Sequence, residues 1–442
     1  MNKSVFDNLP ELEKDQCLEI LRTPLVKLNL ASDYYKAVYH LSKFPGKETE
    51  EILLSLIQQK SEDQAVIIAI RKAIEILAEF KCNKSVELIA QLLNADDKYI
   101  VENSVAALAK LKCNDIKLIE KITKLLDSDK YNKRVLIKSL TLMKTKIHLS
   151  RLKLIQDDNK LDSDVRGAAI ASIFAISGDK SRFKVLIDNL STGNQNQRIC
   201  AIQDIVDAKA DDLILSILNS PLPLSFRLKA FESLITQNIF LNNTYYWLKK
   251  LDYLIEDNTD NMNLDLDNYL NLTTNNLLER LFSPNFLIAY SAQKALLKIK
   301  KDDLCIKLLQ YLPLAQRDYG AIYFFLYLIR NINNYNNKQE KELIKFTESA
   351  LGKNWPSNIK FKPSAILTLF KLKIDLPQYI VRDLLSEKET PFWPSRYATL
   401  MAIDNCPNNN KYDEFLKNSK INQDDSSLFV RTKFIDIYKR LK

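Results

Sequence analysis

The side chains best suited to holding a ligand lie in a short aromatic segment in the C-terminal half of the chain. Tyr319, Tyr323 and Tyr327 stand four residues apart, so a helix would carry their three phenol rings on one face. Asp318 comes directly before them and adds a carboxylate. A stripe of this kind is more often core packing, but it also suits a flat conjugated ligand.

A second segment combines aromatic rings with a cation. Trp393, Arg396 and Tyr397 fall at positions i, i+3 and i+4, which places two rings and a guanidinium on one surface at the start of a helix. Pro391 and Pro394 flank an aromatic pair and make this a rigid corner. Both a binding site and a helix cap fit the pattern.

A third pattern is a regular series of charged residues. Glu102, Arg134, Arg166 and Arg198 are spaced 32 residues apart in the same local context, and Arg227 follows 29 residues later. In stacked helical hairpins such an arginine donates to carbonyls of the preceding turn and pairs with a cap aspartate of the neighbouring repeat. This ladder role is the structural alternative to ligand binding.

Residues for covalent or metal catalysis are scarce. The two histidines, His40 and His148, lie in no recognisable triad context, and the six cysteines form no CxxC pair. The alternating carboxylates within residues 257–276 lack the glycine and terminal glutamate of a calcium loop. We therefore expect no metal and no cofactor. An enzyme with this sequence would act by binding and orienting a reactive substrate.

The elements that must position these residues are helices. The chain has 442 residues with only 6 glycines and 13 prolines, and small and branched apolar residues recur at i, i+3, i+4 and i+7. Two helices per unit and a period of about 32 residues predict an all-α fold, a right-handed α-solenoid of HEAT-like helical hairpins. Function in such a fold lies along a groove or surface.

The repeat pattern also predicts a domain organisation. Residues 1–48 read as an N-terminal cap of short helices broken by prolines, and residues 49–256 as regular repeats. The Asn/Asp-rich stretch 257–276 reads as a loop or hinge, and residues 277–442 as divergent repeats of the same kind.

The charge and hydropathy of the chain argue against two classes of partner. The net charge is +9, but the excess is mostly lysine spread over every repeat, with no basic run interleaved with aromatics. We therefore expect no nucleic-acid partner. The longest apolar stretch, residues 320–329, is far shorter than a membrane span, and the N-terminus has no apolar signal region. These features predict a soluble, cytoplasmic protein with reduced thiols and no membrane insertion.

Several segments resemble the E/F-clan bilin lyases of phycobilisomes, and length and the C-terminal segments favour the branch of phycoerythrobilin lyases that serve phycoerythrin. The resemblance runs from about residue 80 to 405 and departs from the family pattern between residues 283 and 292. The most specific segments are Lys360-Phe-Lys-Pro-Ser-Ala and Phe392-Trp-Pro-Ser-Arg-Tyr-Ala, and the repeat segments around Arg166, Arg198 and Arg227 are less specific.

The resemblance implies that a cysteine thiolate of an acceptor, the phycoerythrin alpha subunit, adds to the ethylidene group of a linear tetrapyrrole, phycoerythrobilin. It also implies a smaller HEAT-type lyase partner. The alternative is a non-catalytic scaffold or chaperone that binds a phycobiliprotein or another protein. Asp204 ranks below Asp318, because it lies six residues after Arg198 and so nearly opposite it on a helix. The roles expected are Asp318 and Asp204 as catalytic carboxylates at the pyrrole nitrogens, Arg198, Arg227 and Arg396 at the propionates, and Tyr319, Tyr323 and Trp393 as walls for the rings, with Tyr397 beside them.

Overall fold

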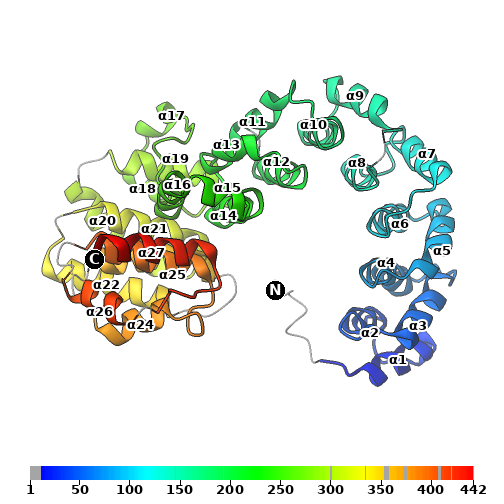
Figure 1. Cartoon of the computed structure of the whole chain (residues 1–442), viewed down its shortest axis with the longest axis horizontal. Coiled ribbons are helices and arrows are strands. Elements are labelled where there is room, and N and C mark those ends of the chain that lie inside the picture. The colour runs from blue at the N-terminus through cyan, green and yellow to red at the C-terminus, as the bar shows by residue number, and fades with distance from the viewer. Residues whose placement is uncertain are drawn as a thin grey trace. The chain divides into compact units, whose positions relative to one another are not determined.

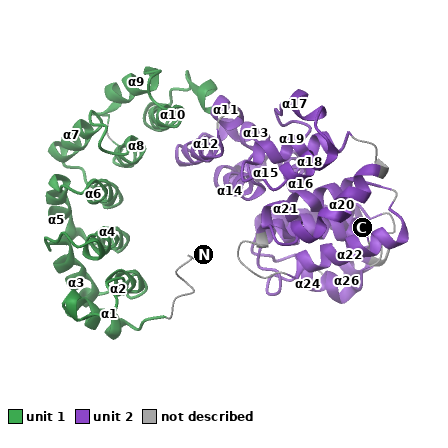
Figure 2. Cartoon of the chain, turned by 180° about the vertical axis from the view of Figure 1, so that it is seen from behind, with its two compact units in different colours: residues 1–186 green, residues 187–442 purple. Residues whose placement is uncertain are grey.

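All regular elements that the structure describes are helices, which confirms the all-α prediction. The computed structural model describes residues 11–144, 146–192, 194–298, 301–333, 335–352, 358–372, 376–406, 410–419 and 421–441. Two compact units divide the chain, residues 1–186 and residues 187–442 (Figure 2). Within each unit, consecutive helices pack as antiparallel hairpins whose neighbours stack side by side (Figure 1).

The first unit is a stack of hairpins with two parallel rows of helices. Helices α4, α6, α8 and α10 form one row in which each packs on the next, and α3, α5, α7 and α9 form the other (Figure 1). The predicted N-terminal cap contains α1 and α2. The helices are α1 (Lys14–Arg22), α2 (Asp33–Leu41), α3 (Lys47–Ile57), α4 (Gln64–Glu79), α5 (Val86–Gln91), α6 (Lys98–Lys110), α7 (Ile116–Leu125), α8 (Lys133–Leu142), α9 (Leu149–Asp157) and α10 (Ser163–Ser177), and α11 (Phe183–Thr192) crosses into the second unit.

Helix ends in the first unit follow the repeat. Asp97 and Asp115 accept hydrogen bonds from backbone N–H groups in the first turns of α6 and α7, as side chains at these cap positions commonly do. The second helix of a hairpin ends in a left-handed residue, which is Lys81, Lys112 or Lys144 in three repeats and Gly178 in a fourth. Glycine is the usual residue in this conformation, since it has no Cβ to clash, so the lysines carry a small backbone cost.

The helices of the second unit vary widely in length, from four residues in α17 to fifteen in α20 and α22. The stretch predicted as a loop, residues 257–276, holds the four-residue helix α17 and the start of α18. The helices are α12 (Gln195–Asp207), α13 (Ile214–Leu218), α14 (Leu224–Leu234), α15 (Gln237–Asn242), α16 (Thr244–Glu256), α17 (Asp267–Leu270), α18 (Thr274–Arg280), α19 (Phe286–Leu296), α20 (Lys301–Ala315), α21 (Tyr319–Asn331), α22 (Asn337–Leu351), α23 (Lys362–Leu372), α24 (Gln378–Leu385), α25 (Trp393–Asp404), α26 (Asn410–Ser419) and α27 (Leu428–Leu441).

The charged series connects successive repeats, as the ladder interpretation predicts. Arg134 donates to the carbonyl oxygen of Asp164, one repeat further on, and Arg166 donates to a carbonyl of helix α9 at 3.2 Å. Glu102 reverses the polarity of its rung: its Oε1 accepts the backbone N–H of Asn132 at 2.8 Å. A carboxylate can therefore replace the guanidinium where the neighbouring repeat offers a donor instead of an acceptor.

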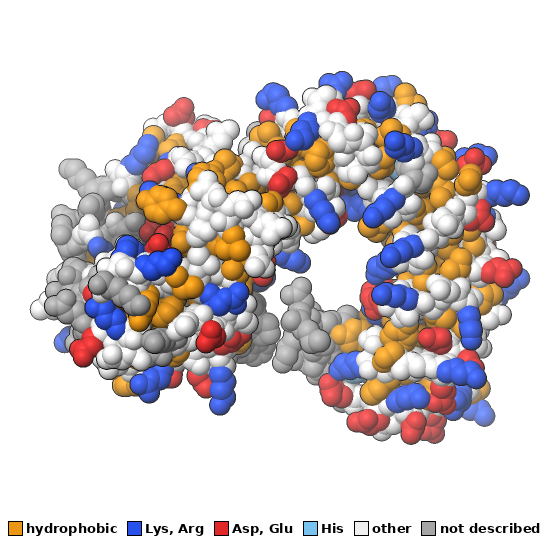
Figure 3. Space-filling model, viewed as in Figure 1, with side chains coloured by type: hydrophobic (Ala, Val, Ile, Leu, Met, Phe, Trp, Pro, Cys, Tyr) orange, Lys and Arg blue, Asp and Glu red, His pale blue; other side chains and the backbone are white. Residues whose placement is uncertain are grey.

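Surface charge in the first unit follows the same repeat. Lys and Arg side chains gather along the row formed by α4, α6 and α8 (Figure 3). Both signs of charge are mixed over the row formed by α3, α5, α7 and α9 (Figure 3). Among the described residues, no helix is long and apolar enough to cross a membrane.

Candidate functional site

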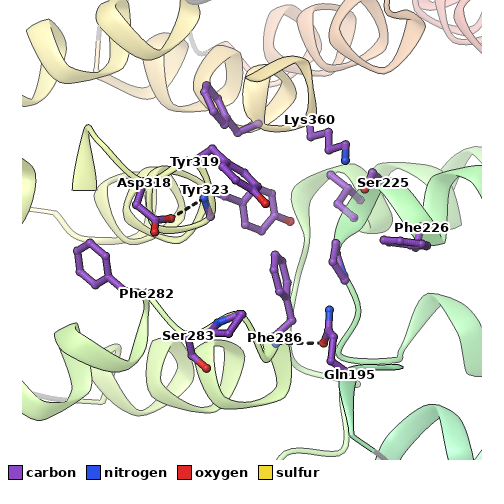
Figure 4. Close-up of a pocket in the computed structure, with 15 residues that line it drawn as sticks. Gln195, Ser225, Phe226, Phe282, Ser283, Phe286, Asp318, Tyr319, Tyr323 and Lys360 are labelled. Atoms are coloured by element: carbon purple, nitrogen blue, oxygen red, sulfur yellow. Dashed lines mark hydrogen bonds between the residues drawn. The ribbon is translucent and has the colours of Figure 1, made fainter. Parts of the chain in front are cut away.

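A cavity in the second unit brings part of the predicted site together. It has a volume of about 300 Å³ and lies between the N-terminal ends of α12, α14, α19 and α21 and the segment that precedes α23 (Figure 4). Its walls are mainly aromatic rings and prolines, and its polar groups come from only seven side chains. The lining residues are Gln195, Pro223, Leu224, Ser225, Phe226, Phe282, Ser283, Pro284, Phe286, Asp318, Tyr319, Gly320, Tyr323, Lys360 and Phe361.

Asp318 is the carboxylate of this cavity. It is the N-cap of α21, and its Oδ1 accepts the backbone N–H groups of Gly320 at 2.8 Å and Ala321 at 2.9 Å. These bonds fix the carboxylate at the N-terminus of α21. Its Oδ2 has no hydrogen-bond partner among the described residues, and this oxygen remains available to an N–H donor of a ligand.

The phenolic stripe on α21 divides into an exposed and a buried part. Tyr319 is 60% exposed and stands at the rim of the cavity, whereas Tyr323 is 7% exposed and forms part of its wall (Figure 4). Tyr327 is buried outside the cavity, with its ring 5.1 Å from the guanidinium of Arg330. Two of the three tyrosines are thus placed to contact a ligand.

Arg227 is a ladder residue, and all three nitrogens of its guanidinium donate hydrogen bonds to protein oxygens. It is 1% exposed. Its Nε donates to the carbonyl of Leu222 at 2.9 Å, its Nη1 to that of Leu218 at 3.1 Å, and its Nη2 to the carboxylate of Asp257. These are the carbonyls of the preceding turns and an aspartate 30 residues further on, as the ladder role requires. Arg227 does not line the cavity.

Asp257 connects this arginine to the cavity wall. Its Oδ2 accepts hydrogen bonds from the hydroxyls of Tyr290, at 2.8 Å, and Tyr323, while Oδ1 accepts from Arg227. Burial, and then the Asp257 carboxylate, raise the pKa of the Tyr323 phenol well above its usual value. The wall ring of Tyr323 is therefore held from behind by a buried, charge-balanced network.

Arg198 also lies behind the cavity. It is fully buried, and burial lowers the pKa of its guanidinium to about 10. Its Nη2 donates to Gln195 at 2.9 Å and to Asn285, and Gln195 also accepts the backbone N–H of Phe286 at 3.2 Å. Arg198 thus ties the start of α12 to the start of α19 and positions Gln195, which does line the cavity. Asp204, buried on the same helix, lies outside the lining.

The second predicted segment, at the start of α25, is separate from this cavity. Arg396 pairs through Nε and Nη2 with both carboxylate oxygens of Asp425, each at 2.7 Å, and is 1% exposed. Tyr397 is fully buried and donates to Asp252 at 2.7 Å. The ring of Trp393 packs against aromatic neighbours, with its centroid 6.3 Å from that of Tyr397. This segment joins helices α16, α25 and α27. All three guanidinium nitrogens of Arg396 are bonded to protein oxygens, so this arginine offers no free cation to a propionate.

Twelve of the fifteen lining residues were not assigned to the site from the sequence. Among these, Lys360 lies in a segment that carries the resemblance, and Phe282 and Phe286 lie in or beside the segment that departs from the family pattern. The signal was local composition, and nothing in it indicated that these segments meet.

The fold and the cavity together define a class: an all-α protein of stacked HEAT-like hairpins with an aromatic-walled cavity in its second unit. No family model matches the chain. It is 28% identical to "Bilin biosynthesis protein CpeY" of Synechococcus sp. (strain WH8020) over 376 residues, which cover 85% of this chain and 89% of that protein. It is 26% identical to "Uncharacterized phycocyanin operon protein Y" of Pseudanabaena tenuis (strain PCC 7409) over 97% of this chain and 98% of that protein.

These two relatives confirm the resemblance seen in the sequence. Among solved structures, the chain is similar to the complex of CpcE and CpcF of phycocyanin lyase from Nostoc sp. PCC7120, with a TM-score of 0.46 and 17% identity over 57% of this chain and 98% of that one.

Proposed function

We propose that this protein is a bilin lyase that acts in phycobiliprotein maturation, and that it attaches phycoerythrobilin to a cysteine of a phycoerythrin subunit, the alpha subunit. The observation that carries the proposal is the similarity to "Bilin biosynthesis protein CpeY", which spans 85% of the chain and includes the segments that form the cavity.

The reaction is an addition and needs no oxidant or reductant. The acceptor thiol adds across the ethylidene double bond of the bilin, so that one C–S bond forms, the C=C π bond is lost and the thiol proton ends on the tetrapyrrole. The protein's part in such a step is to hold the two reactants in one geometry and to stabilise the charge on the conjugated system.

The chemistry of the cavity supports a bilin as the ligand. Flat conjugated rings fit between the side chains of Phe282, Phe286 and Tyr319. The free oxygen of Asp318 is placed to accept a pyrrole N–H, and a carboxylate at that position also stabilises the protonated, more electrophilic ring system. The ammonium group of Lys360 is the cation for a propionate.

The cavity supports only part of the site expected from the sequence. Asp318, Tyr319 and Tyr323 keep their proposed roles, and Lys360 takes the propionate role. Arg198, Arg227 and Arg396 serve as buried struts between helices, and Trp393, Tyr397 and Asp204 lie outside the lining. The proposal assigns these six residues no contact with the bilin.

Coexpression with a phycoerythrin alpha subunit and a source of phycoerythrobilin tests the proposal. The measurement is the bilin that stays on the acceptor after denaturation, detected as fluorescence on a denaturing gel, with the smaller lyase partner present and absent. The wild-type chain is expected to give a fluorescent acceptor. Tyr319→Ala removes one wall and is expected to lower the attachment rate about tenfold, since a stacked ring contributes about 1–1.5 kcal/mol.

A matched tyrosine serves as the control. Tyr379 on α24 is 66% exposed, similar to Tyr319 at 60%, and does not line the cavity. Tyr379→Ala is expected to leave the rate unchanged. If no bilin becomes attached even with the partner present, while the chain still copurifies with the acceptor, the scaffold alternative replaces the lyase.

A further inference from the structure

The cavity is small for the substrate it is proposed to bind. Its volume of about 300 Å³ stands at the lower end of the range for small-molecule sites, roughly 300–1,000 Å³. A linear tetrapyrrole has four rings and two propionate side chains. The cavity encloses a part of such a molecule and leaves the rest outside.

The charges of the cavity lead to the same result. A bilin carries two propionates, one on each of its two middle rings. Among the described residues that line the cavity, Lys360 is the single basic side chain and Asp318 the single acidic one. One propionate thus finds a cation inside, and a second one would be buried without a partner, which is strongly unfavourable.

The buried arginines near the cavity do not change this count. Arg227 has hydrogen bonds from all three of its guanidinium nitrogens to protein groups behind the wall formed by Tyr323. Arg198 is fully buried and does not line the cavity, and its Nη2 donates to Gln195 and Asn285. Withdrawing Arg227 would leave the buried carboxylate of Asp257 without its cation.

We propose that the cavity takes one two-ring half of the bilin, with a single propionate on Lys360 and a pyrrole N–H on the free oxygen of Asp318. The other half, which ends in the ring that carries the ethylidene group, stays outside, where the acceptor thiol reaches it. The exposed ring of Tyr319 at the rim marks the point where the chromophore leaves the cavity. This inference rests on the proposed function and specifies which part of the substrate the site recognises.

The probe for this inference is a dipyrrinone monocarboxylic acid, which has the two rings and one propionate of half a bilin. Its binding to the whole chain is measured by competition against phycoerythrobilin, whose absorption spectrum reports its own binding. The half-molecule is expected to displace the bilin completely. Lys360→Gln is expected to weaken binding of the dipyrrinone acid about tenfold, the loss of one charge-assisted hydrogen bond.

Two controls isolate the propionate contact. The methyl ester of the dipyrrinone is expected to bind the wild type and Lys360→Gln equally, because it has no carboxylate to pair. Lys371→Gln changes an exposed lysine on the following helix, outside the cavity, and is expected to leave all affinities unchanged.

The outcomes separate the two proposals. If the chain binds phycoerythrobilin and the dipyrrinone acid displaces none of it, the half-molecule inference is overturned. It is also overturned if Lys360→Gln changes the affinities for the acid and for the methyl ester equally. A chain that binds no tetrapyrrole at all overturns the proposed function itself.

Discussion

Replacing Asp257 by asparagine is the most informative perturbation of the network behind the cavity. Asparagine keeps the size of the side chain and tolerates the left-handed backbone at this position, where φ is 55°. What changes is the charge: Arg227, 1% exposed, loses its counterion inside the protein, and the hydroxyls of Tyr290 and Tyr323 lose a charged acceptor.

The size of the effect follows from this geometry. An uncompensated buried charge costs about 3–5 kcal/mol. The remaining amide oxygen still accepts one hydrogen bond, so we expect a loss of about 3 kcal/mol in the free energy of unfolding of the second unit. Combining Asp257→Asn with Arg227→Met removes the orphaned charge, and the double variant is expected to be about 2 kcal/mol more stable than the sum of the single effects.

Urea unfolding followed by tryptophan fluorescence measures this for the second unit alone, because all three tryptophans, at positions 247, 355 and 393, lie after residue 187. The control is Asp436→Asn, which removes the half-exposed partner of Arg440 and is expected to cost less than about 1 kcal/mol. Equal effects of Asp257→Asn and Asp436→Asn, or strict additivity in the double variant, would refute the reasoning.

Three further results are expected. Burial raises the pKa values of Tyr290 and Tyr323, so the folded state keeps two protons that the unfolded chain releases above pH 10. The free energy of unfolding is therefore constant below that pH with respect to these groups, and falls above it by about 1.4 kcal/mol per pH unit per tyrosine. Urea titrations at alkaline pH measure this slope, and each Tyr→Phe variant is expected to remove the contribution of one tyrosine. Burial lowers the pKa of His148 to about 4, so between pH 6.5 and 4 the unfolded chain binds a proton that the folded first unit does not bind. The free energy of unfolding therefore decreases as the pH falls, by about 2 kcal/mol between pH 7 and 5. Unfolding followed by circular dichroism measures this, and His148→Met should abolish the pH dependence. Lys112→Gly relieves a left-handed backbone and should stabilise the first unit by about 0.5–1 kcal/mol in thermal unfolding. Glu120→Gly, at an exposed position in the middle of α7, should destabilise it by a similar amount, and the same sign for both would contradict the explanation.

Local pattern was sufficient for the helices and for the ladder. The periodicity of 3.6 residues and the capping aspartates act within one hairpin, and a fixed repeat places residue i beside its counterpart about 30 positions later. For this reason the contacts of Arg227 with the preceding turns and with Asp257 follow the rule inferred from spacing alone.

The same regularity misled the choice of site residues. An arginine in each repeat is equally suited to bridge two helices or to contact a ligand. The sequence does not show whether protein groups already satisfy the hydrogen bonds of its guanidinium. Arg396 illustrates the difference, because Asp425 satisfies two of its nitrogens only after α25 and the segment before α27 have packed together.

The sequence by itself determined that this chain is helical, repetitive and poor in catalytic nucleophiles, and its segments carried the resemblance to bilin lyases. These properties depend on neighbours within one or two repeats. Only the tertiary structure decided which polar groups face a cavity and which are buried as struts. Asp318 and Lys360 are 42 residues apart, and Gln195 precedes both by more than 120, so their meeting depends on how irregular hairpins of the second unit stack. Burial and hydrogen bonding then assign each charged side chain its role.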